Sequence, residues 1–284
     1  MVAAFVIAVQ LGFAPFIDIP MDFWGIAPSV PMKQMPALER KRDRAVVLIH
    51  GLKAQVFSPE RAEYPDPHNF QKPRSELVKA LSDDFDVFGV SYAQVGPVDW
   101  VTASPILREG IKALRFAGYK EIILVGHSAG GIIARKFVEM NPASGITKVI
   151  AVASPYLGSG WAKLPNQLLP KSQVVFIRSL LPDVREECTR NCTTKLPEDF
   201  QFCCVVCKLP RLDSDTTVGV DSQWPRDLQK LGIPVTLVNC NHFDAMKCEK
   251  GVQAVVELAK GKVVRWTPAE VEKAQRIIFG GVPR

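Results

Sequence analysis

The residues best placed to do chemistry in this chain are the five at 126–130, which read Gly-His-Ser-Ala-Gly. An apolar run at 122–125 precedes them and a helix-like segment at 131–138 follows, so the pattern predicts a sharp turn from a strand into a helix. Such a turn strains the serine backbone, and glycines on both sides let strand and helix approach closely. Ser128 is therefore the candidate nucleophile. The alternative is a chance match in a glycine-containing turn.

A serine nucleophile needs a base, because its hydroxyl reacts poorly at neutral pH, and the base needs a carboxylate to orient it. A serine in this kind of turn is followed along the chain first by the acid and then by the histidine. Of the four histidines, at positions 50, 68, 127 and 242, only His242 follows Ser128. His242 is therefore predicted to be the base, the alternative being a structural histidine in a loop.

The candidate acids are Asp213, Asp215 and Asp221, which all follow an apolar segment at 200–206. We prefer Asp215, because its setting, Ser-Asp-Thr-Thr-Val, is similar to the sequence around the acid in many lipase-like hydrolases. Asp213 and Asp221 are then expected to be turn or surface carboxylates. The same surface role is the alternative for Asp215.

An oxyanion intermediate needs two fixed N–H donors. One is expected from the residue after the nucleophile, Ala129, and the other from the loop after the first core strand, at Leu52. Gly51 is expected to let the backbone of that loop come close to the nucleophile. His50 and His127 are predicted to have structural roles.

The elements that must position these residues alternate between apolar strands and amphipathic helices. Strands are predicted at 45–49, 86–92, 122–125, 148–153, 200–206 and 234–238, and helices at 75–81, 106–116, 131–138 and 252–259. This alternation predicts an α/β fold with a mostly parallel sheet and helices on both faces. Ligands bind beyond the carboxyl ends of such strands.

The chain of 284 residues is long enough for one large core, and we expect a single domain at 45–260. The alternation breaks at about 158–199, where several prolines and leucines favour a lid inserted over the site. Residues 1–44 are predicted to be an apolar segment followed by an extended arm. Residues 261–284 are predicted to be a peripheral tail, with a further helix at 271–279.

The net charge of +6 is modest, and most basic residues are interspersed with acidic ones, which argues against a nucleic-acid partner. Residues 1–17 are almost wholly apolar and could act as an export signal, a membrane anchor or a packing segment of the core. No basic residue precedes this run, as a signal peptide would require. It is also short for a membrane span, and Pro15 interrupts it. Membrane association through this segment and a cytoplasmic location both stay open.

The seven cysteines all lie in the second half of the chain, and Cys240 and Cys248 flank His242. In an exported protein this pair would form a disulfide across the histidine loop. A second possibility is a zinc site, and the third is a set of reduced core cysteines. The candidate zinc ligands are Cys188, Cys192, Cys203 or Cys204, and Cys207.

Four segments together resemble the α/β-hydrolase superfamily. They are His50-Gly51-Leu52, the run at 126–131, the run Ala-Ser-Pro-Tyr-Leu-Gly at 153–158, and Asp215 with His242. Within the superfamily the sequence is similar to bacterial lipases and inositol-deacylase-like lipases over about 45–259. Ser154 and Tyr156 stand where those lipases have threonine and histidine.

The resemblance implies a lipase or carboxylesterase that cleaves lipid-like esters through an acyl-enzyme and requires neither metal nor organic cofactor. A thioesterase acting on acylated proteins or carriers is the nearest alternative. A binding protein that uses the fold without catalysis is a second, because fold does not fix function.

Overall fold

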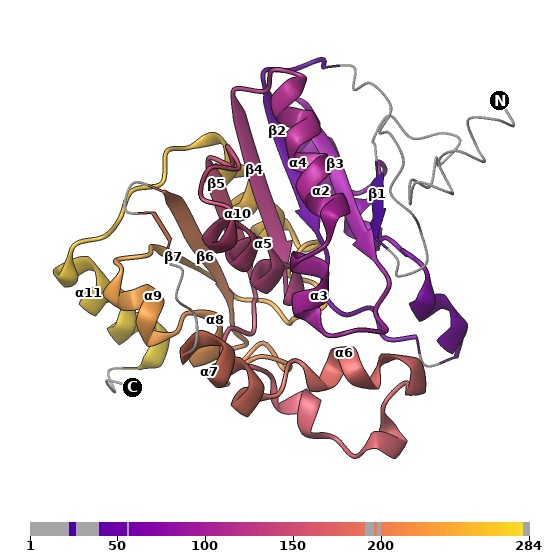
Figure 1. Ribbon diagram of the computed structural model, residues 1–284. Helices are drawn as coiled ribbons and strands as arrows, with labels where there is room; N and C mark the ends of the chain where they lie inside the picture. Colours follow the sequence, from indigo (N-terminus) through magenta and orange to yellow (C-terminus); the bar gives the residue numbers. More distant parts are fainter. Residues whose placement is uncertain (1–22, 27–39, 56, 191–195, 198–199, 281–284) are drawn as a thin grey trace, which may run out of the picture.

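A computed structural model describes residues 23–26, 40–55, 57–190, 196–197 and 200–280 (Figure 1). The expectations for residues 1–17 and for Cys192 lie outside this part of the chain. The described strands form a seven-stranded sheet in the order β1-β3-β2-β4-β5-β6-β7, and every neighbouring pair is parallel. The strands are β1 (Phe23–Ile26), β2 (Arg44–Ile49), β3 (Asp86–Tyr92), β4 (Glu121–His127), β5 (Lys148–Val152), β6 (Gln201–Cys207) and β7 (Val235–Val238).

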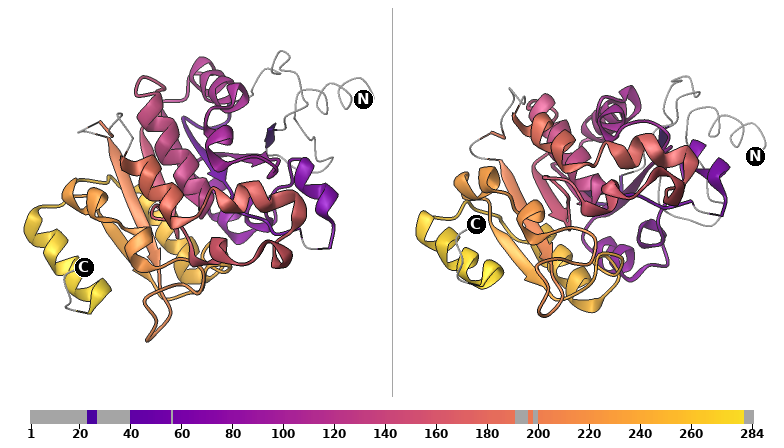
Figure 2. Two further views of the ribbon diagram at one scale, coloured as in Figure 1. Left: turned by 60° about the horizontal axis from the view of Figure 1, so that its bottom comes forward. Right: turned by 90° about the horizontal axis from the view of Figure 1, so that it is seen from below.

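Helices cover both faces of the sheet, as Figures 1 and 2 show. Strand β2 explains why, since Ala45, Val47 and Ile49 belong to one buried cluster whereas Val46 and Leu48 belong to another. A strand buried on both faces reads as a continuous apolar run. The helices outside the insertion are α2 (Glu76–Ser82), α3 (Val98–Thr102), α4 (Pro105–Phe116), α5 (Ala129–Met140), α8 (Val220–Gln223), α9 (Arg226–Lys230), α10 (Glu249–Lys260) and α11 (Pro268–Phe279), with short 3₁₀ turns η1 (Pro59–Glu63) and η2 (Asn69–Gln71).

The predicted fold class is confirmed, and most elements lie within one or two residues of their predicted bounds. Helix α10 begins three residues early, because its first turn carries the polar Glu249 and Lys250, which hide the apolar periodicity. Strand β1 was not predicted, since the segment at 20–36 reads as irregular. Its four residues pair with β3, a partner more than 60 residues away that no local pattern reveals.

The described part of the segment at 158–199 consists mainly of short helices and 3₁₀ turns. It contains η3 (Gly160–Lys163), η4 (Asn166–Leu168), η5 (Lys171–Gln173), α6 (Val174–Arg178) and α7 (Pro182–Arg190). Figure 1 shows α6 and α7 below the sheet, at the end where the strand arrows point. The buried side chains of Phe176, Ile177 and Leu180 belong to the main apolar cluster. The insertion is therefore packed onto the body through its own core residues.

Helix α11 also packs onto the body, in contrast to the peripheral tail that the basic sequence suggests. Its apolar side chains recur at helical spacing, and Val271, Ala274 and Ile278 are buried. Phe279 stacks on Trp224 with ring centroids 6.3 Å apart. Among the described residues, no helix combines the length and the apolar character that crossing a membrane would need.

Candidate active site

Ser128 lies at the sharp turn between β4 and α5, with φ 54° and ψ −127°. A positive φ in a residue other than glycine costs roughly 1–3 kcal/mol and persists only where the surroundings impose it. Here the Ser128 amide donates to the carbonyl of Val152 at 2.8 Å. A Cβ at Gly126 would collide with the backbone of Gly130, and one at Gly130 with the carbonyl of Ile49. The two glycines thus allow the close strand–helix approach that the turn requires.

The structure brings Ser128, His242 and Asp215 into one hydrogen-bonded chain. His242 Nε2 lies 3.0 Å from Ser128 Oγ, and His242 Nδ1 lies 2.7 Å from Asp215 Oδ2. A carboxylate can only accept, so Nδ1 carries the proton and Nε2 is left to accept from the serine hydroxyl. All three residues are buried, Asp215 completely. The arrangement can therefore move the serine proton onto the imidazole and stabilise the positive charge that results.

The carboxylate of Asp215 is held by backbone amides. Its Oδ1 accepts from the amides of Thr217 at 2.9 Å and Val218 at 2.7 Å, while the His242 amide donates to the Asp215 carbonyl at 2.8 Å. These bonds offset the cost of burying a charge.

The other two candidate acids are exposed. Asp213 forms an ion pair with Lys208 at 3.2 Å, and Asp221 accepts from the amide of Ser222 at 2.9 Å.

The loop after β2 lies against the nucleophile. A Cβ added to Gly51 would lie 2.9 Å from Ser128 Oγ, so only glycine allows this approach. The loop that carries Leu52 therefore passes close to the serine, and Leu52 stays the predicted second oxyanion donor. Ala129 is fully buried and begins α5, where backbone amides have no helical partner and favour negative charge.

All four histidines gather around the site. The rings of His127 and His242 are 5.0 Å apart, as are those of His50 and His68. Burial lowers the pKa of His50 to about 4 and that of His127 to about 3, so both are neutral at pH 7. His127 Nε2 lies 3.0 Å from the carbonyl of His242 and so supports the loop that carries the base.

Sequence reasoning left His68 without a role, since no motif marks it within its long loop. Burial likewise lowers the pKa of His68 well below its ordinary value. The sequence also gave no sign of Gln94 and Gln173, two buried side chains that contact the loop after β2.

Comparison with known proteins identifies the family of the chain. The model of a family described as "Alpha/beta hydrolase family" matches residues 46–257, which is most of the chain. The chain belongs to this family. The superfamily predicted from the sequence motifs is thereby confirmed.

Solved structures share the fold of this α/β-hydrolase. The mature lipase BlEst2 of Bacillus licheniformis superimposes with a TM-score of 0.60 at 13% identity, over 80% of this chain and 96% of that one. The phospholipase PlaB of Legionella pneumophila, in complex with thio-NAD, gives 0.58 at 11% identity, over 84% of this chain and 62% of that one. No curated protein matches this chain by sequence. At such identities the likeness shows the fold alone.

The predicted disulfide between Cys240 and Cys248 is not present in this α/β-hydrolase. The six described cysteines are free thiols, Cys240 and Cys248 included. Hydrogen bonds from Cys207 and Cys248 lower the pKa of the Cys240 thiol, so the three form a contact cluster. Within the described part of the chain, no three histidine, cysteine or acidic side chains are arranged to bind one metal ion.

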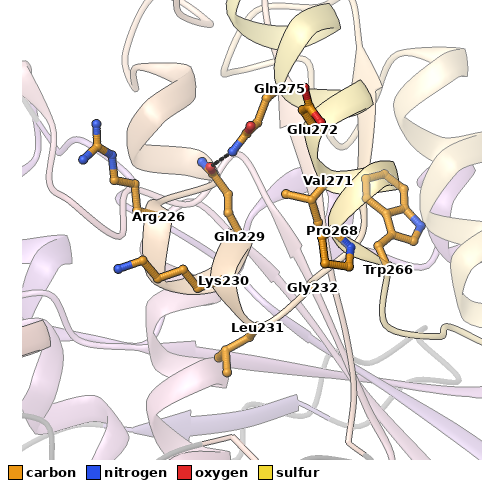
Figure 3. Close-up of a pocket in the computed structure, with 10 residues that line it drawn as sticks. All are labelled: Arg226, Gln229, Lys230, Leu231, Gly232, Trp266, Pro268, Val271, Glu272 and Gln275. Carbon is orange, nitrogen blue, oxygen red and sulfur yellow. Dashed lines mark hydrogen bonds between the residues drawn. The ribbon is translucent and has the colours of Figure 1, made fainter. Parts of the chain in front are cut away.

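An open groove lies between α9 and α11, apart from the candidate site (Figure 3). Its volume is about 550 Å³, and Gln275 Nε2 donates to Gln229 Oε1 at 2.7 Å within it. It contains neither serine nor histidine. The lining residues are Arg226, Gln229, Lys230, Leu231, Gly232, Trp266, Pro268, Val271, Glu272 and Gln275.

Proposed function

We propose that this α/β-hydrolase cleaves carboxylic esters through a serine-linked acyl-enzyme. The observation that carries the proposal is the continuous chain from Ser128 Oγ through His242 to Asp215, set at a strained strand–helix turn. Membership of the family supports hydrolysis in general. The hydrogen-bonded chain supports serine as the nucleophile.

The mechanism follows from the donors and acceptors at the site. Ser128 Oγ attacks the ester carbonyl while His242 Nε2 takes its proton, and the buried carboxylate of Asp215 stabilises the resulting imidazolium. The oxyanion accepts hydrogen bonds from the amides of Leu52 and Ala129. His242 then gives its proton to the leaving alcohol as the carbon–oxygen bond breaks. A water molecule repeats the sequence on the acyl-serine and releases the acid.

A lipid-like ester is the substrate class that the surroundings favour. The insertion exposes three large apolar side chains, Trp161, Leu168 and Val175, and Phe243 beside the candidate base is 61% exposed. Exposed apolar groups of this kind favour contact with an apolar substrate. The two solved structures that share the fold are a lipase and a phospholipase, which supports the same substrate class.

The deciding experiment is labelling with a fluorophosphonate, with wild type beside Ser128→Ala. We expect labelling of the wild type and its loss in the variant. No labelling of folded wild type, with or without detergent, would refute the nucleophile and favour a binding protein.

Turnover of p-nitrophenyl esters from acetate to palmitate then sets the substrate class. Rates that rise with chain length indicate a lipase, and a short-chain preference indicates an esterase. Faster turnover of a matched acyl thioester would instead indicate a thioesterase.

A further inference from the structure

Two buried glutamines hold the loop that carries the candidate oxyanion donor Leu52. Gln94 follows β3 and is 3% exposed, whereas Gln173 ends η5 in the insertion and is completely buried. A buried amide is costly unless its polar atoms are hydrogen-bonded, so the partners of these side chains are informative.

Gln94 binds the backbone on both sides of Leu52. Its Nε2 donates to the carbonyl of Gly51 at 2.8 Å, and its Oε1 accepts from the amide of Lys53 at 3.0 Å. The Gly51 carbonyl also accepts from His50 Nδ1 at 2.7 Å. One amide side chain therefore fixes two successive peptide units of a segment that has no regular secondary structure.

Fixing the Gly51 carbonyl also fixes the direction of the Leu52 N–H. The two groups belong to one trans peptide unit and point to opposite sides of it. Gln94 and His50 occupy the carbonyl side, which leaves the N–H facing the other way. Because Gly51 packs directly against Ser128, the loop is held where that N–H can serve the nucleophile.

Gln173 links this arrangement to the insertion. Its Nε2 donates to the Lys53 carbonyl at 2.9 Å and to Gln94 Oε1 at 2.8 Å, and its Oε1 accepts from the Gln55 amide at 2.8 Å. If η5 moved away, three polar groups next to the loop would lose these bonds. The insertion thus contributes to the site through direct contact with the loop.

We propose that Gln94 and Gln173 are positioning residues that set the Leu52 amide for the oxyanion, so that the insertion and the catalytic loop form one unit. This inference rests on the proposed ester hydrolysis. It predicts that the insertion cannot shift at η5 without loss of turnover. The glutamines act on the transition state and should affect kcat more than KM.

The test compares Gln94→Leu and Gln173→Leu with wild type on a soluble p-nitrophenyl ester. Active sites are counted by the end point of fluorophosphonate labelling. We expect kcat per labelled site to fall about 10- to 100-fold with KM within about threefold, since loss of a whole oxyanion donor costs about 10²–10³. Affinity for a trifluoromethyl ketone, whose adduct carries an oxyanion, should fall in parallel with kcat/KM.

Gln229→Leu is the matched control. Gln229 is also buried and donates to the Trp224 carbonyl at 2.6 Å, but it lies at the groove of Figure 3. Its variant should lose stability and keep wild-type kcat per labelled site. Unchanged kcat in both folded loop variants would overturn the proposal.

The proposal stays testable if the leucine variants do not fold, and its failure differs from a failure of the proposed function. If the leucine variants do not fold, Gln94→Met and Gln173→Met keep the length of the side chain and lose the donated hydrogen bonds. These methionine variants should show the same loss of kcat, and wild-type kcat in them would equally overturn the proposal. A failure of the proposed function is distinguishable, because the wild type itself would then neither label nor turn over.

Discussion

Acidification should destabilise this protein well above the pH at which carboxylates titrate. His50 and His127 are buried, and burial lowers their pKa values from the ordinary 6.5 to about 4 and about 3. In the unfolded chain both bind a proton below pH 6.5, whereas in the folded protein they stay neutral to about pH 4. The stabilisation is therefore complete above pH 6.5 and is lost as the pH falls.

The magnitude follows from proton counting. Each histidine takes up one proton on unfolding in this window, which lowers the free energy of unfolding by about 1.4 kcal/mol per pH unit. Between pH 6.5 and pH 5 the loss is about 2 kcal/mol for each residue, or about 4 kcal/mol for the pair. His68, whose pKa burial also lowers, adds to it. This is a large part of the roughly 5–15 kcal/mol by which domains are stable.

Urea unfolding at pH 7, 6 and 5, followed by tryptophan fluorescence, measures this slope. The free energy of unfolding of His50→Asn should fall less steeply with decreasing pH, by about 1.4 kcal/mol per pH unit, since one titrating group is removed. Asp84→Asn is the control, because Lys260 lowers the pKa of Asp84 and its effect lies below about pH 5. A free energy of unfolding that stays flat from pH 6.5 to 5, or one equally steep in His50→Asn, would refute the reasoning.

Three further predictions concern single side chains. Asp215→Asn should lower kcat by about 10⁴, while Asp213→Asn, an exposed change, should leave it near wild type in the same ester assay; equal losses would contradict the assignment. Gly51→Ala should abolish turnover and slow fluorophosphonate labelling, because its methyl group would lie 2.9 Å from Ser128 Oγ; wild-type labelling rates would rule out this packing. Phe279→Ala should lower the free energy of unfolding by about 3 kcal/mol or more, as measured by urea titration, whereas a truly peripheral tail would show less than about 0.5 kcal/mol.

The sheet was predictable because parallel strands buried on both faces give continuous apolar runs. The run at 45–49 and the segment at 86–92 mark β2 and β3 without further information. The turn at Ser128 was predictable for a related reason, since strand, glycine pair and helix follow one another between residues 121 and 140. Strand β1 was not, because its pairing with β3 depends on residues distant in sequence.

Contacts between distant segments explain what the sequence hid at the candidate site. Gln173 meets Lys53 and Gln94 from an insertion more than 70 residues away, and a single buried amide leaves no periodic or spaced pattern. The nucleophile and base are found by residue type, because few side chains can do their chemistry. The loop that orients the oxyanion donor is instead held by whichever polar side chain the fold brings within reach. Residues of this second kind can be found only from the folded structure, and they decide whether a correctly chosen nucleophile can stabilise its transition state.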